Sequence, residues 1–146
     1  MTTELHLKLV SRIETISNLN AGIDEFAEKN RLERSVVFDL RLVLEELIVN
    51  IIHYAFEDAE QAHPIDVLLA SAKYGEAVSV TIEDGGLEFD PTEEIPTDLP
   101  GASPDGGFGI FLVSQKTRDL KYERIEGKRN RVSFWVDCGK GEPEDQ

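Results

Sequence analysis

Three polar residues recur at helical spacing within the segment EELIVNIIHYAF. Glu46, Asn50 and His53 are four and then three residues apart, so on a helix they fall within about 60° of one another, beside the apolar arc. An ordinary boundary between the buried and exposed faces of a helix has the same pattern. The alternative is chemical, because a carboxylate and a neutral amide at this margin could hold a proton acceptor and a Mg²⁺ ligand side by side.

A second polar cluster, IEDGGLEFDP, follows a run of alternating apolar residues. Asp84 precedes Gly85 and Gly86, and this combination is typical of a turn. A buried aspartate can also accept a hydrogen bond from an exocyclic amine, and a glycine lets a flat ring approach the backbone. The cluster therefore fits either a simple turn or a site that recognises adenine.

A third segment, DGGFGIFLVSQ, places three glycines directly before an apolar run with helical spacing. Gly106, Gly107 and Gly109 could form a flexible hinge. They could also expose successive N–H groups at a helix start, where the helix dipole favours anions. No Lys or Arg lies between Lys73 and Lys116, so a phosphate bound here would depend on backbone amides and a metal ion.

The composition limits the classes of partner. The chain of 146 residues has 29 acidic and 15 basic residues, a net charge of −14, which would repel nucleic acid. Cys138 is the only cysteine, so no intrachain disulfide can form and a reducing, cytoplasmic location is expected. The N-terminal segment lacks the pattern of a targeting peptide, and no apolar run approaches the roughly 18 residues of a membrane span. We expect one domain over residues 1–146, with no direct contact to nucleic acid or membrane.

Apolar periodicity predicts the elements that would position the three clusters. Alternation of period two predicts strands, and spacings of three and four predict helices. Ser17 or Asn18 is expected to cap the first helix, and four of the six prolines lie between Gly85 and Gly107, which predicts a long loop. The predicted order is a strand at 5–9, helices at 19–27 and 33–56, strands at 65–69 and 78–82, a loop at 85–107, a helix to 117, and strands at 120–122 and 132–136 around a turn at 126–130.

This order of elements predicts the fold class. Strands that mostly follow one another without an intervening helix favour a mixed, mostly antiparallel sheet, with the helices gathered on one face. The expected architecture is therefore a two-layer α/β sandwich. Residues 139–146, GKGEPEDQ, are expected to form a frayed tail.

Taken together, the motifs resemble a known ATP-binding fold. A Glu-x-x-x-Asn helix, a strand ending in Asp-x-Gly, a long loop and a glycine-rich helix start resemble the GHKL superfamily (Bergerat fold), which includes gyrase, histidine kinases and MutL. Within it the chain is most similar to the RsbW-like anti-sigma factors, which are serine-protein kinases. Phe89 to Pro91 (FDP) and GGFGIFLV are particularly like that group, and the resemblance spans about residues 5–136.

The resemblance implies a role for each motif residue. Glu46 would be the general base, Asn50 would ligate Mg²⁺ that bridges the phosphates, and Asp84 would bind the adenine amino group. The loop 87–105 would be a lid over ATP, and Ser133 matches a hydroxyl that supports the adenine-binding aspartate. The other residues implied to contact the nucleotide are His53, Gly86, Gly106, Gly107, Phe108 and Gly109.

Two positions depart from the family pattern. The residue three beyond the asparagine is usually basic, whereas His53 is only partly charged near neutral pH. The next position is commonly histidine, whereas this chain has Tyr54, which an aromatic residue of the core or its boundary would also explain. Both departures concern the contacts that this turn of the helix would make to phosphate.

The resemblance implies a partner-switching function. The chain would be an anti-sigma factor and serine-protein kinase, dependent on ATP and Mg²⁺, that phosphorylates a STAS-type anti-anti-sigma protein and sequesters a sigma factor. Whether it forms a homodimer is left open. One alternative is a nucleotide-gated binding module without turnover, and another is an acidic adaptor that needs no nucleotide. A histidine-kinase catalytic domain is a further alternative, although the chain has no helical dimerisation segment with a phosphoacceptor histidine.

Overall fold

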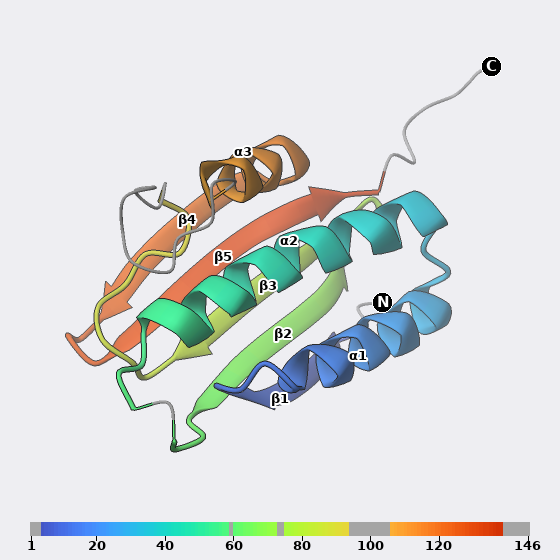
Figure 1. Ribbon diagram of the computed structural model, residues 1–146. Coiled ribbons are helices and arrows are strands. Elements are labelled where there is room, and N and C mark those ends of the chain that lie inside the picture. Colours follow the sequence, from blue (N-terminus) through green and yellow to red (C-terminus); the bar gives the residue numbers. More distant parts are fainter. Residues whose placement is uncertain (1–3, 59, 73–74, 94–105, 139–146) are drawn as a thin grey trace.

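The computed structural model describes residues 4–58, 60–72, 75–93 and 106–138, and these form two layers. Helices lie over one face of a sheet (Figure 1), so the predicted two-layer α/β sandwich is confirmed. Residues 94–105 of the predicted lid and the predicted tail 139–146 lie outside this description. The elements are β1 (Glu4–Val10), α1 (Thr15–Asn30), α2 (Arg34–Tyr54), β2 (Pro64–Ala72), β3 (Ala77–Asp84), α3 (Gly106–Lys116), β4 (Arg118–Ile125) and β5 (Arg129–Asp137).

The sheet has the strand order β1-β2-β3-β5-β4. Every neighbouring pair is antiparallel, so the predicted sheet is antiparallel throughout the described residues rather than mixed. The last strand, β5, inserts between β3 and β4, and its register places Asn130 opposite Asp84 and Ser133 opposite Thr81. The sheet therefore brings a residue from late in the sequence to the strand end that carries Asp84.

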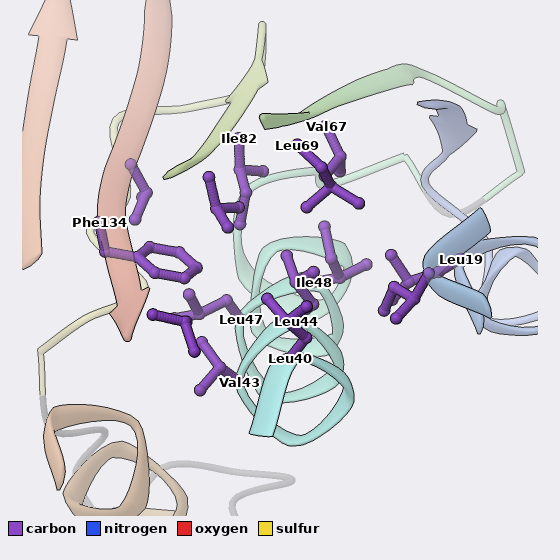
Figure 2. Packing of buried hydrophobic residues seen from close by; sticks show 14 of the residues in the cluster. Leu19, Leu40, Val43, Leu44, Leu47, Ile48, Val67, Leu69, Ile82 and Phe134 are labelled. Carbon is purple, nitrogen blue, oxygen red and sulfur yellow. The ribbon is translucent and has the colours of Figure 1, made fainter. Parts of the chain in front are cut away.

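Helix α2 lies at the centre of the core. Its buried side chains Leu44, Leu47 and Ile48 face the inward side chains of the sheet, including Ile82 and Phe134 (Figure 2). Burying an aliphatic or aromatic side chain of this size stabilises a fold by about 1.5–3 kcal/mol. The apolar arc predicted for this helix therefore fixes the face that it turns toward the sheet, and with it the edge on which its polar residues lie.

The first helix begins earlier than the sequence pattern indicates. Helix α1 starts at Thr15, not after the predicted caps Ser17 or Asn18. The buried hydroxyl of Thr15 accepts a hydrogen bond from the backbone N–H of Val10 (3.2 Å), which joins the helix directly to the end of β1. Within the described ranges no helix combines the length and apolarity that crossing a membrane would require.

Charged side chains form a ladder on the sheet face that points away from the helices. Glu83 of β3 accepts hydrogen bonds from Arg129 (3.2 Å) and Arg131 (2.7 Å) of β5. Arg129 also pairs with Asp66 of β2 (3.5 Å), which bonds to His6 of β1 (3.1 Å). Arg131 reaches a glutamate of β4 (3.7 Å). The ladder therefore touches all five strands and keeps this face polar along one row.

The packing of α2 makes a testable prediction about stability. Leu44→Ala removes a fully buried side chain and should lower the free energy of unfolding by about 2–5 kcal/mol. Phe38→Ala, on the same helix but with the side chain 62% exposed, should change it by less than about 0.5 kcal/mol. Urea unfolding followed by the fluorescence of the single tryptophan, Trp135, measures both. Equal losses from the two variants would contradict the assigned orientation of α2.

Candidate functional site

Helix α2 carries the first pair of predicted site residues. The amide of Asn50, 8% exposed, donates through Nδ2 to Oε2 of Glu46 (3.3 Å). Since the nitrogen is engaged, the carbonyl oxygen of Asn50 is the atom of this amide able to ligate a cation. His53, one turn further on, is exposed, and its ring meets the Tyr54 ring edge-on at 6.2 Å between centroids. The described contacts of His53 therefore join it to Tyr54 and not to the Glu46–Asn50 pair.

The start of α3 lies directly on the carboxylate of Glu46. A Cβ atom added to Gly109 would overlap both carboxylate oxygens and Cδ of Glu46, so only glycine allows this approach. Gly109 is the fourth residue of α3, which begins at Gly106, and the first four N–H groups of a helix have no partner within the helix. An ion pair between Lys116 and Asp39 (3.3 Å) holds the other end of α3 against α2.

The glycine-rich segment forms the first turn of α3, which is one of its two interpretations from the sequence, and the helix begins at Gly106, inside the loop predicted for residues 85–107. Gly106, Gly107 and Phe108 occupy the first three positions of α3. Unpaired N–H groups at such a turn favour an anion, both through hydrogen bonds and through the helix dipole. The same turn lies beside the oxygens of Glu46, so a bound phosphate and a carboxylate would meet at one place.

Asp84 ends strand β3 with only 1% of its surface exposed. Its Oδ1 accepts hydrogen bonds from the backbone N–H of Gly86 (2.8 Å) and from Nδ2 of Asn130 (2.9 Å). Burial raises the pKa of this carboxyl above its ordinary value, although the hydrogen bonds from Asn130 and Gly86 and the nearby Arg129 and Arg124 oppose the shift. The strand end therefore presents a buried acceptor that is held in one orientation.

Gly86 joins this strand end to the end of α2. A Cβ atom at Gly86 would collide with the backbone carbonyl oxygen of Ala55 and touch the ring of Phe56. The same carbonyl accepts a hydrogen bond from the N–H of Leu87 (2.8 Å). The glycine is therefore required for close approach of the chain to α2. The resemblance had implied close approach of a nucleotide, and the position of Gly86 next to Asp84 is compatible with both.

Asn130 is a site residue that the sequence reasoning missed. Its buried amide donates to Asp84 and to the backbone carbonyl of Leu87 (2.8 Å). Its oxygen accepts from the hydroxyl of Tyr122 (2.6 Å) and from Nη1 of Arg124 (3.0 Å). The sequence had placed Asn130 in a turn, but the turn ends one residue before β5 begins, and the strand register delivers the side chain to Asp84.

The role that the resemblance implied for Ser133 is not what the structure shows. Ser133 pairs with Thr81, three residues along β3 from Asp84. Side chains alternate between the two faces of a strand, and the buried neighbours Val132 and Phe134 point toward the helices, so Ser133 points to the other face. The side chain that supports Asp84 is Asn130, which lies three residues earlier in β5 and on the helix side.

The first residues of the predicted lid are anchored to both layers. Phe89 donates its backbone N–H to Oδ1 of Asn130 (3.3 Å), and its ring packs on Tyr54 at 5.5 Å between centroids. Asp90 accepts hydrogen bonds at Oδ1 from both the N–H and the hydroxyl of Thr92 (2.9 and 2.6 Å). The FDP motif therefore starts the loop from a fixed base, with Tyr54 as one of its supports.

The oxygen atoms gathered here fit a magnesium ion that is held mainly by the phosphates of a bound nucleotide. Mg²⁺ prefers oxygen ligands and commonly binds through one or two protein groups plus phosphate oxygens and water. The carbonyl oxygen of Asn50 is such a group, beside Glu46 and the first turn of α3. Within the described ranges no cluster of three or more His, Cys, Asp or Glu side chains could hold a metal without help from a ligand.

Comparison with known proteins decides the family. The family described as Histidine kinase-like ATPase domain matches residues 9–135. The chain belongs to this family. Membership implies the use of ATP.

Individual relatives of this family member agree with that placement. The chain is 29% identical over 124 residues to the serine/threonine-protein kinase BtrW of Bordetella bronchiseptica, covering 83% of this chain and 85% of that protein. It is 22% identical over 140 residues to the serine-protein kinase RsbW of Oceanobacillus iheyensis, covering 90% and 86%. The likeness to RsbW-like kinases that the motifs indicated is thereby confirmed.

A solved structure has the same fold. The chain resembles the RsbU and RsbW domains of Rv1364c from Mycobacterium tuberculosis, with a TM-score of 0.66 and 14% sequence identity. The match covers 92% of this chain but 32% of that one, so the present chain spans about a third of its length. The similarity shows that the layered arrangement of α2, α3 and the sheet is shared.

The buried carboxylate of Asp84 leads to a prediction about the pH dependence of stability. Because the folded-state pKa of Asp84 is raised, the charged form weakens the fold once the pH rises through that pKa. Asp84→Asn should therefore raise the free energy of unfolding at neutral pH, and the gain should shrink to nothing as acid protonates the wild-type carboxyl. Chemical unfolding across the pH range measures this difference.

Glu83, the preceding residue, provides a control of opposite sign. Burial raises its pKa, but hydrogen bonds and charge from Arg131 and Arg129 outweigh burial, so the pKa of Glu83 is lowered. Glu83→Gln should therefore reduce stability at neutral pH, and its cost should vanish as the pH falls through the lowered pKa. If the two variants showed the same pH trend, the assigned environments of the two carboxyls would be wrong.

Proposed function

We propose that the chain is an ATP-dependent serine-protein kinase and anti-sigma factor that acts by partner switching. The observation that carries the proposal is the placement of two recognition groups along α2. Asp84 and Gly86 lie against Ala55 at one end, and the first turn of α3 lies against Glu46 at the other. Nine helical residues span about 13 Å, which is similar to the length of an extended adenosine triphosphate. The names of the relatives BtrW and RsbW support the kinase activity.

Each group in this arrangement has a proposed role toward ATP. Asp84 accepts a hydrogen bond from the adenine amino group, and Gly86 keeps the backbone close. The N–H groups of the α3 start, Gly106 to Gly109, hold the phosphates, and Asn50 ligates Mg²⁺. His53, exposed beside this region, is a proposed phosphate contact, and residues 87–105 are the proposed lid.

The proposed mechanism depends on positioning more than on covalent chemistry. Mg²⁺, when bound, neutralises charge that develops on the transferred phosphoryl group. Glu46 accepts the proton of the attacking serine hydroxyl, and its contact with Gly109 places its oxygens beside the phosphate-binding turn. The hydrogen bond from Asn50 engages Oε2 of Glu46. The other oxygen is left to meet the substrate.

The proposed partners are a sigma factor and a STAS-type anti-anti-sigma protein. Phosphorylation adds about 1.5 to 2 negative charges to the modified serine. The kinase has a net charge of −14, so a phosphorylated partner would be repelled and released, which frees the chain to capture the sigma factor. This proposal includes a cytoplasmic location and leaves open a homodimer.

A second candidate function is a nucleotide-gated binding module without turnover. The observation that favours it is the turn after Asn50, where His53 is exposed and the Tyr54 ring is committed to Phe89. Fewer side-chain contacts to the terminal phosphate would remain for catalysis. In this case ATP binding would order a protein surface and no phosphoryl group would be transferred.

Glu46→Gln tests the proposed kinase. The variant keeps the side-chain shape but cannot accept a proton, so ATP affinity should stay within about threefold while phosphoryl transfer falls by about 10²–10⁴-fold. Calorimetric titration with ATP and Mg²⁺ measures binding, and radiolabel transfer to the STAS-domain proteins of the same organism measures turnover. Glu45→Gln, on the neighbouring position that bonds to Asn20 of α1, is the matched control and should keep both.

The outcomes separate the two candidate functions. Unchanged transfer by Glu46→Gln would remove Glu46 from the role of general base. Binding of ATP by the wild type without transfer to any STAS protein would favour the binding module. A wild type that binds no ATP would overturn both.

Gly109→Ala makes a second test of the same geometry. The new methyl group must displace the Glu46 carboxylate, which is the mobile end of a flexible side chain, so the fold should be retained. Transfer should nevertheless fall by at least about tenfold, since a shift of about 1 Å in a catalytic group is costly. Gly127→Ala is a control for glycine replacement outside the site, although its φ of 68° should lower the melting temperature. Full activity of Gly109→Ala would contradict the assigned contact.

A further inference from the structure

The hydrogen-bond partners of the Asn130 side chain allow only one orientation of its amide group. Its amide nitrogen donates to Oδ1 of Asp84 and to the carbonyl of Leu87. Its oxygen accepts from the Tyr122 hydroxyl and from Arg124. The amide cannot be reversed, because Arg124 and the backbone N–H of Phe89, which both bond to its oxygen, can only donate, and the carbonyl of Leu87 can only accept. The amide is therefore fixed with its nitrogen toward Asp84.

This orientation decides what Asp84 can offer to a ligand. Both described hydrogen bonds, from Asn130 and from Gly86, go to Oδ1, so Oδ2 takes part in neither. An ionised carboxylate accepts hydrogen bonds and donates none, whereas a protonated carboxyl can donate one. Adenine presents an amino group at the position where guanine and hypoxanthine present a carbonyl oxygen. Adenine therefore needs a hydrogen-bond acceptor at Oδ2 of Asp84, whereas guanine and hypoxanthine need a donor there.

We propose that Asn130 is the positioning residue that sets the base preference of the site, because its donated hydrogen bond holds Asp84 as an acceptor for a 6-amino purine. The inference rests on the proposed ATP site and deepens it. Without this bond, Asp84 would be both less constrained and more easily protonated, and a 6-oxo purine nucleotide would compete better. Asn130 bonds to Oδ1 of Asp84, so its proposed effect on the choice of base acts through that carboxylate.

The surrounding charges support this assignment. Burial acts to raise the pKa of Asp84 toward the neutral form, and the bond from Asn130 is the largest of the effects that oppose it. The nearby cations are Arg124 of β4 and Arg129 of β5. Other titratable groups near this end of the packed elements include Tyr122 of β4, Glu88 and Asp90 of the loop, and His53 and Tyr54 at the end of α2.

A pair of variants with the same shape tests the proposal in the full chain. Asn130→Thr keeps a hydroxyl that can donate to Asp84, whereas Asn130→Val replaces that hydroxyl with a methyl group. Both are β-branched and suit strand β5. ATP and inosine triphosphate, which differ at the 6-position, are titrated calorimetrically with Mg²⁺ at neutral and at mildly acidic pH. Asn20→Ala is the control, since this asparagine bonds to Glu45 between α1 and α2.

The expected result is a change in preference and not only in affinity. The wild type and the Asn20→Ala control should favour ATP, and Asn130→Thr should retain most of that preference. Asn130→Val should lose about tenfold or more in the ratio of ATP to inosine triphosphate affinity, the worth of one hydrogen bond to a charged group. The loss should grow at the lower pH, where protonation of Asp84 is easier. If Asn130 had a purely structural role, the Val variant would lose affinity for both nucleotides to the same extent.

Each contrary result has a separate meaning. If the wild type binds neither nucleotide, the proposed ATP site falls, and this inference falls with it. If the wild type prefers ATP but the Thr and Val variants have the same ratio at both pH values, the inference alone is overturned. Should Asn130→Val not fold, as judged by circular dichroism, Asn130→Ala takes its place, with the same expected ratio and the same contrary result.

Discussion

A carboxylate with 1% of its surface exposed is the constraint on which the candidate site depends. Asp84 loses nearly all contact with water at the end of β3, so its charged form exists only through hydrogen bonds and nearby cations. Gly86 and Asn130 supply the hydrogen bonds, and Asn130 in turn is held from β4. One buried charge thus requires three strands and the first residues of a loop to meet at one point.

The central helix, α2, has to accommodate a polar side chain beside its apolar face. One face of α2 is wholly apolar and fills the core, yet Asn50 on its margin is also largely buried. An asparagine is a poor helix former, and it is tolerated here because Glu46, one turn earlier, accepts its amide hydrogen. The two residues are therefore joined by a hydrogen bond in the folded chain, and the carboxylate oxygens of Glu46 lie at the first turn of α3.

The sequence predicted the layers and most of the site, for reasons that can be traced to particular residues. Periodicity located α2 and the strands because their buried faces are long and regular. The glycines before α3 and the Asp84 cluster were found because local spacing carries their chemistry. Asn130 was missed because its function arises from strand register, which pairs it with a residue 46 positions earlier in the sequence. Ser133 was assigned wrongly for a related reason. A hydroxyl suits the role of supporting Asp84, but Ser133 lies on the other face of β5.

The position of β5 between β3 and β4 has a consequence for how the chain is made. Strands β1, β2 and β3 precede residue 85, but the partner of Asp84 belongs to β5, which the ribosome makes later. Until β5 enters the sheet, one edge of β3 is open and its terminal carboxylate lacks the hydrogen bond from Asn130. The surroundings that hold Asp84 are therefore complete only after β5 has been made and has joined the sheet.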